Sequence, residues 1–239
     1  MNLASIQVLR AFAAWVVVIH HVHQVFFGFN ATSIFGWLAA TKGAVGVDIF
    51  FVISGFVMVV STHGRDMSAR EFLLRRLSRI VPIYWIASLI TLGMMVAFPV
   101  LKTGEVKTTL DHFVASLAFL TSFDQQNFFP VLPVGWSLNF EMAFYVMFAA
   151  SLYVASRFVD SSVMNSTAWP LALMILGCQV YPSGLPGSGF AKNSLMLLFL
   201  VGELFGWCHV RKLLTKTRML GVLFLVGGVT LILMSSARG

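Results

Sequence analysis

Long apolar runs make up most of the chain, and short polar stretches separate them. A helix needs about 20 mostly apolar residues to cross the hydrocarbon core of a bilayer. By this criterion the pattern predicts seven membrane-spanning helices. They cover roughly residues 7–29, 43–62, 80–100, 135–156, 168–181, 193–209 and 219–235. The apolar stretch at 113–122 is too short to cross, so we predict an interfacial or re-entrant helix there.

Composition supports this interpretation. Hydrophobic residues make up 58% of the 239 residues and charged residues only 10%, too few to cover the surface of a soluble domain. We therefore predict an all-α, polytopic integral membrane bundle that forms a single transmembrane domain over 1–239. The first apolar run is too long for a cleavable signal peptide, so we expect it to act as a signal anchor.

The distribution of lysine and arginine selects one topology. With seven spans and a cytoplasmic N-terminus, 11 of these residues lie inside and 5 outside. If 113–122 also crossed, the split would be 8 to 8, so the positive-inside rule favours seven spans. The net charge of +7 is expected to lie on cytoplasmic loops that face anionic membrane lipids. Nucleic-acid binding is disfavoured because the basic residues flank apolar spans and do not line one soluble face.

Among the ionisable side chains inside predicted spans, four are the main candidates: Arg10, His21, Asp48 and Glu141. A bilayer core disfavours such groups by a few kcal/mol, which makes them candidates for function. Arg10 and His21 are 11 residues apart, almost three whole helical turns, so they share a helix face from which His20 is turned away. The topology places Arg10 near the cytoplasmic surface. It places His21, Asp48 and Glu141 at similar depth in the outer half.

Four segments of the sequence match motifs of one known family, and they occur in the same order and with the same spacing. They are LRAFAAWVVVIHH, with arginine, ten residues and histidine, then GVDIFFVISGF, RRLSRIVPIYW and PVGWSLNFEMAFY. Together they resemble the acyltransferase 3 family of membrane O-acyltransferases. The last segment looks most like the exopolysaccharide branch of ExoZ-like proteins. The resemblance covers about residues 1–209 and is dense only in 1–150.

The resemblance implies transfer of an acyl group, expected to be acetyl, from a cytoplasmic acyl-CoA to a sugar hydroxyl. The acceptor would be a lipid-linked or exported polysaccharide at the bacterial inner membrane. No bound cofactor and no metal are expected, and the partners would be acyl-CoA, the glycan and membrane lipids. The family's motif residues carry over to Arg10, His21, Phe50, Phe51, Ser54, Gly55 and Glu141.

In such a reaction His21 is the candidate general base, since an imidazole titrates near neutral pH and can take the proton of an attacking hydroxyl. Asp48 or Glu141 can orient the imidazole, as acidic residues do in hydrolase triads, or bind sugar hydroxyls. The alternatives are a histidine bonded to a backbone carbonyl within the bundle and a purely structural polar pair.

The binding candidates also have simpler explanations. Arg10 can clamp the phosphates of coenzyme A in bidentate geometry, or serve only as a positive-inside anchor. Ser54 and Gly55, with Phe51, can line an acyl channel or simply allow close helix packing. Trp136 can stack on a sugar or belong to the aromatic belt at the membrane surface.

Two other functions stay open. A transporter of an anionic or acylated solute would use the same charges as a binding relay, but it predicts internal repeats that the sequence does not show. Members of the resembled family usually have more spans than the seven predicted here. A short variant, a fragment or a truncated, non-catalytic remnant is therefore a further alternative.

Overall fold

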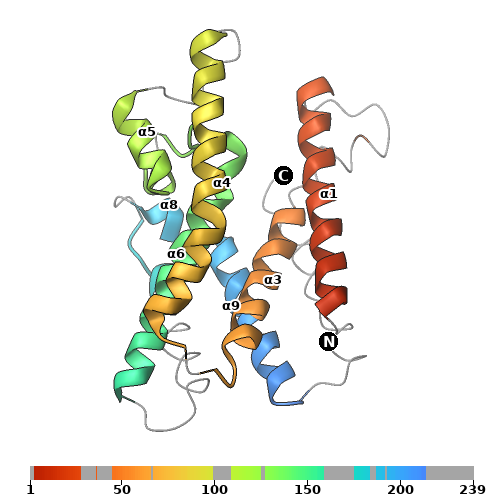
Figure 1. Cartoon of the computed structure of the whole chain (residues 1–239), viewed down its shortest axis with the longest axis vertical. Coiled ribbons are helices and arrows are strands. Elements are labelled where there is room, and N and C mark those ends of the chain that lie inside the picture. The colour runs from red at the N-terminus through yellow and green to blue at the C-terminus, as the bar shows by residue number, and fades with distance from the viewer. Residues whose placement is uncertain are drawn as a thin grey trace. The chain divides into compact units, whose positions relative to one another are not determined.

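The computed structural model describes residues 3–27, 36, 45–65, 67–98, 109–124, 127–158, 175–183, 187–191 and 193–213. Within these residues every regular element is a helix (Figure 1). Five described helices are long and apolar enough to cross a membrane: Ile6–Phe27, Val45–Thr62, Ala69–Ala97, Pro133–Val154 and Ser188–Val210. The predicted all-helical membrane class is thus confirmed.

The predicted number of seven spans stays a prediction. The span expected at 219–235 lies outside the described residues, as does 168–174 of the span expected at 168–181. The described chain divides into two compact units: Met1–His63 with Leu198–Gly239, and Gly64–Leu197. Each unit is described by itself below.

In the first unit, helix α1 (Leu3–Phe27) lies beside α3 (Val45–Thr62) and runs in the opposite direction (Figure 1). Gly46 allows this approach, because a Cβ atom built on it would lie 2.6 Å from the carbonyl oxygen of Ala13. Further along, Ile6 packs against the cluster of Phe56 and Phe205. The two contacts define an antiparallel register in which Gly46 faces the middle of α1 and Phe56 faces its first turns.

Helix α3 also contacts α9 (Ser194–Val210) through glycines on both helices. Cβ atoms built on Gly55 and on Gly202 would overlap the carbonyl oxygens of Phe199 and Val52. One turn on, a Cβ on Gly206 would lie 2.8 Å from the Val59 Cβ. Later residues of α3 contact later residues of α9, so the two helices run parallel. Such small-residue spacing lets backbones approach in membranes, where van der Waals packing replaces the hydrophobic effect.

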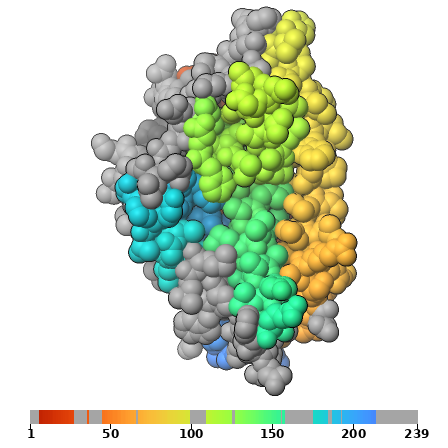
Figure 2. Space-filling model, turned by 90° about the vertical axis from the view of Figure 1, so that its left-hand side faces the viewer, coloured from red at the N-terminus to blue at the C-terminus, as the bar shows by residue number. Residues whose placement is uncertain are grey.

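The second unit contains α4 (Ala69–Ala97), α5 (Leu110–Leu117), the 3₁₀ turns η2 (Thr121–Phe123) and η3 (Pro133–Gly135), α6 (Trp136–Phe158) and α8 (Ser188–Ala191). On the face seen in Figure 2, α4 runs along one edge, with α5 beside its upper part and α6 beside its lower part. Helix α4 begins well before the apolar run predicted at 80–100. Its start is a cap in which the Ser68 hydroxyl accepts from the Glu71 backbone N–H at 3.2 Å.

The last turn of α5 is held by side chains that complete backbone hydrogen bonds. Tyr84 Oη donates to the Ser116 carbonyl at 3.0 Å, and Trp85 Nε1 donates to the Leu117 carbonyl at 3.1 Å. These carbonyls belong to the last turn of α5, where a helix has no partners of its own. The Ser116 hydroxyl accepts from the Val131 backbone N–H at 3.0 Å. Irregular backbone inside a membrane protein requires this kind of burial and pairing.

Candidate functional site

Helix α1 is continuous from Leu3 to Phe27, so the 11-residue spacing places Arg10 and His21 on one flank of it. Both side chains are half-buried, and Ala13 between them is fully buried against α3. His21 forms a side-chain hydrogen bond with Gln24. The rings of His20 and His21 lie 5.3 Å apart in an edge arrangement. A cation and an imidazole therefore project from the same side of one membrane helix.

Asp48 lies in the first turn of α3 and is only 6% exposed. A carboxylate is favoured there by the positive end of the helix dipole. In the α1–α3 register Asp48 lies near the level of Ala13, and His21 is eight residues further, about 12 Å along the axis. The sequence expectation that His21 and Asp48 lie at similar depth does not match this register. Asp48 is too far away to hydrogen-bond the imidazole directly and lies closer to the level of Arg10.

The motif around Ser54 forms part of the contact between α3 and α9. The Phe51 ring is buried and meets the Phe199 ring edge-on at 4.6 Å between centroids. Gly55 faces the α9 backbone, where its built Cβ would lie 2.9 Å from the Glu203 nitrogen. Of the two explanations left open by the sequence, the structure supports helix packing for Phe51 and Gly55. Ser54 is half-buried beside them.

Glu203 is a buried acid in that same contact. Its side chain is 2% exposed, and neither carboxylate oxygen has a hydrogen-bond partner among the described residues. Isolated buried carboxylates are strongly disfavoured, so such a group is held neutral or binds a partner. The burial of Glu203 without a partner among the described residues is visible only in the folded unit.

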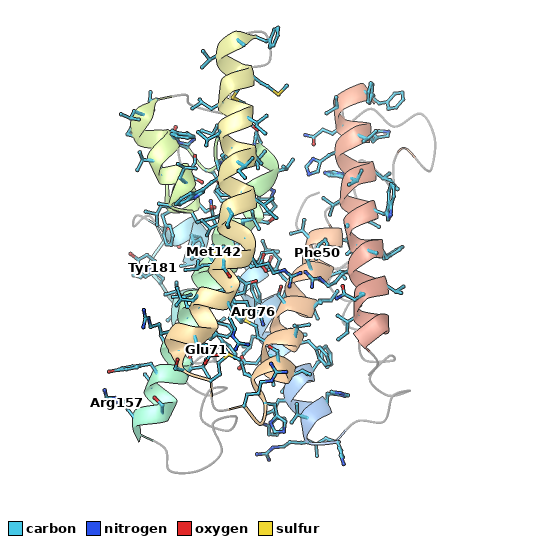
Figure 3. The ribbon with its side chains drawn as sticks, viewed as in Figure 1. Phe50, Glu71, Arg76, Met142, Arg157 and Tyr181 are labelled. Atoms are coloured by element: carbon cyan, nitrogen blue, oxygen red, sulfur yellow. The ribbon has the colours of Figure 1, made fainter. Side chains whose placement is uncertain are left out.

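Glu141 belongs to the second unit, on α6, and is half-buried. Tyr145, one turn further, donates its hydroxyl to Glu141 Oε1 at 2.5 Å. The guanidinium of Arg76, on α4, lies 5.8 Å from the centre of the Tyr145 ring and 5.4 Å from that of Phe72 (Figure 3). Such stacking holds a cation beside the aromatic pair. The carboxylate candidate is thus fixed by a tyrosine that sequence reasoning did not single out, although the four-residue spacing predicts such a pair.

Trp136 lies on the other side of α6 from Glu141, because five residues turn a helix by about 140° beyond one full turn. Its half-buried ring lies 5.8 Å from that of Phe128 and 6.0 Å from that of Phe140. The two sequence candidates on α6, Glu141 and Trp136, therefore do not share a face.

A buried polar cluster on the Trp136 side of α6 was not predicted from the sequence. Asn139 Nδ2 donates to Thr121 Oγ1 at 2.7 Å and to Ser122 Oγ at 2.8 Å. Nearby in the same unit, His112 Nε2 lies 3.1 Å from the Phe129 carbonyl oxygen. The signal available in the sequence was an asparagine inside an otherwise apolar run.

Metal-ligating side chains are dispersed in the part of the chain that the structure describes. Within it, no three His, Cys, Asp or Glu side chains come together in a way that could hold a metal ion. Cys178 and Cys208 are free thiols.

Long apolar helices with polar groups inside them define an integral membrane protein of the helical class. A family model described as an acyltransferase domain matches residues 3–237. The chain therefore belongs to the acyltransferase 3 family, as the four sequence segments predicted.

Three relatives illustrate the similarity. The chain is 46% identical over 122 residues to the exopolysaccharide production protein ExoZ of Rhizobium meliloti, covering 48% of this chain and 36% of that protein. It is 32% identical over 157 residues to the acyltransferase MdmB of Streptomyces mycarofaciens, covering 62% and 38%. It is 28% identical over 188 residues to the O-acetyltransferase OatA of Staphylococcus aureus, covering 72% and 28%.

The matched part of the chain thus spans little more than a third of these relatives at most. No solved structure matches the chain.

Proposed function

We propose that the chain is an O-acyltransferase that moves an acetyl group from acetyl-CoA to a sugar hydroxyl of an exported or lipid-linked polysaccharide. It would act in the bacterial inner membrane with its N-terminus in the cytoplasm. Family membership supports acyl transfer. The name of one relative refers to exopolysaccharide production and that of another to O-acetyl transfer, which supports the acceptor and the acyl group.

The observation that carries the proposal is the shared flank of Arg10 and His21 on α1. The two residues are 11 positions apart, about 16 Å along the helix axis. An extended pantetheine arm, which joins the diphosphate of coenzyme A to its sulfur, can bridge a separation of this size. One helix can therefore offer a guanidinium to the phosphates and an imidazole near the thioester.

The proposed reaction begins when His21 accepts the proton of the sugar hydroxyl. The sugar oxygen then attacks the thioester carbonyl, the carbon–sulfur bond breaks, and the leaving thiolate takes up the proton as free coenzyme A. Arg10 holds the diphosphate through paired N–H donors. No oxidant, metal or further cofactor is needed to balance this step.

The acidic residues take separate roles in this proposal. Asp48 lies near the level of Arg10, so it is suited to balance the charge of the guanidinium. Glu141, held by the Tyr145 hydroxyl, is the carboxylate proposed to assist proton transfer.

The test uses the full chain in lipid nanodiscs with labelled acetyl-CoA, with and without a polysaccharide acceptor. We expect label to enter the acceptor, His21→Ala to abolish transfer, and the neighbouring His20→Ala to retain most of it. Equal loss in both variants would remove His21 from its role as base. Movement of labelled solute across sealed vesicles without ester formation would instead establish the transporter.

A further inference from the structure

The buried amide of Asn139 has one polar end without a partner. The side chain is 1% exposed, and its Nδ2 donates to the hydroxyls of Thr121 and Ser122. Its Oδ1 has no hydrogen-bond partner among the described residues. Both hydroxyl residues are buried as well, which places three polar side chains together inside the second unit.

The Oδ1 end of the amide therefore needs a donor that the described residues do not supply. Leaving such a group unpaired costs about 1–3 kcal/mol, which a bound hydroxyl or water would recover.

Aromatic rings lie on the same side of α6 as this amide. Trp136 precedes Asn139 by three residues, which places the two side chains about 60° apart around the helix. The Trp136 ring is half-buried and meets Phe128 and Phe140 at centroid distances of 5.8 and 6.0 Å. Few fixed polar groups beside an aromatic surface are the usual composition of a small-molecule site. A sugar ring, with an apolar face and a rim of hydroxyls, has the complementary chemistry.

We propose that Asn139, fixed by Thr121 and Ser122, is the hydrogen-bonding group of a binding site for a hydroxyl of the acceptor sugar, with Trp136 as the stacking surface. The proposal rests on the proposed function, since it identifies the side of α6 that holds the acceptor. It also separates the acceptor contact from Glu141, which projects about 200° away around the same helix. The sugar hydroxyl would donate to Oδ1.

Binding of cellotetraose to the full chain in nanodiscs, in the absence of any acyl donor, tests this site directly. Asn139→Leu removes both polar ends, and Trp136→Phe reduces the stacking area while keeping an aromatic ring. We expect roughly tenfold weaker saccharide binding from each substitution, equivalent to about 1.4 kcal/mol. In acetyl-transfer assays the KM for the acceptor should rise while the KM for acetyl-CoA stays unchanged.

Ser116→Ala is the matched control. It removes a buried hydroxyl whose hydrogen bonds go to the backbone of His112 and Val131 and not to the Asn139 amide. Equal loss of saccharide binding in the control and in Asn139→Leu would show that Asn139 has only a structural role. Unchanged binding in a folded Asn139→Leu protein would mean that a water fills the site, and would overturn the proposal.

Further measurements distinguish a folding defect from the loss of this site, and failure of the site from failure of the proposed function. If Asn139→Leu does not fold, the combined change of Thr121→Val and Ser122→Ala releases the amide without filling the site, and the same loss is expected. Saccharide binding without any acetyl transfer would refute the proposed function and leave this site standing. Acetyl transfer with an acceptor KM that neither the Asn139 nor the Trp136 substitution changes would refute this site and leave the proposed function standing.

Discussion

The contact between α3 and α9 predicts that Gly202→Ala destabilises the protein although alanine is the better helix former. A Cβ atom on Gly202 would overlap the Val52 carbonyl oxygen and lie 2.8 Å from its carbonyl carbon and 3.0 Å from the Phe56 nitrogen. All three are backbone atoms, so no rotamer change can relieve the clash. The two helices must move apart.

The size of the effect follows from two opposing terms. Overpacking a tight contact costs about 1–3 kcal/mol, and here the loss of backbone contact along both helices places it at the upper end. Replacing glycine by alanine inside a helix returns about 1 kcal/mol. The net change is a loss of roughly 1–2 kcal/mol in the free energy of unfolding. At about 2–4 °C for each kcal/mol, the midpoint of thermal unfolding should fall by several degrees.

Gly93→Ala is the matched control, since no atom lies within 4 Å of the position that its Cβ would take. It receives the helix-propensity gain alone and should unfold at the same temperature or slightly higher. The free thiols of Cys178 and Cys208 are half-buried, so a thiol-reactive dye can follow unfolding of purified protein in detergent. A Gly202→Ala protein as stable as Gly93→Ala would refute the close helix contact.

Two other substitutions test buried polar groups. Tyr145→Phe keeps the ring beside Phe72 but removes the hydrogen bond to the Glu141 carboxylate, and it should lower the free energy of unfolding by about 1–3 kcal/mol; a thermal midpoint equal to that of the parent would argue against the pair. Glu203→Leu should instead raise the thermal midpoint, because it removes a buried acid without a described partner, and an added loss of acetyl transfer would show that the acid is kept for function.

Hydropathy predicted the long helices well because the bilayer requires about 20 apolar residues for each span. The span predicted at 80–100 lies mostly within a longer helix, α4, that begins at Ala69. Arginine is a good helix former, so the helix continues through the basic segment to the Ser68 cap, where hydropathy carries no signal. Hydropathy finds where a chain can lie in lipid, whereas caps and propensities decide where the helix begins.

The sequence could predict only those features of the candidate site that depend on a single helix. The common flank of Arg10 and His21 follows from 3.6 residues per turn and needs no tertiary information. The level of Asp48 depends on where Gly46 allows α3 to meet α1, which no local pattern reveals. The hydrogen bonds of Asn139 likewise depend on how the 3₁₀ turn η2, with Thr121 and Ser122, packs against α6.

Helix α6 shows why one motif can supply two different kinds of chemistry. On one face Glu141 and Tyr145 lie within a helical turn of each other, and the guanidinium of Arg76, on α4, lies over the Tyr145 ring. The opposite face carries Asn139, a neutral amide among buried hydroxyls, where a second charge would have no partner. A neutral face suits an uncharged acceptor sugar, and a charged face suits proton transfer. Asn139 and Glu141 are only two residues apart, but two residues turn a helix by about 200°. The amide and the carboxylate of this segment therefore project from opposite sides of α6.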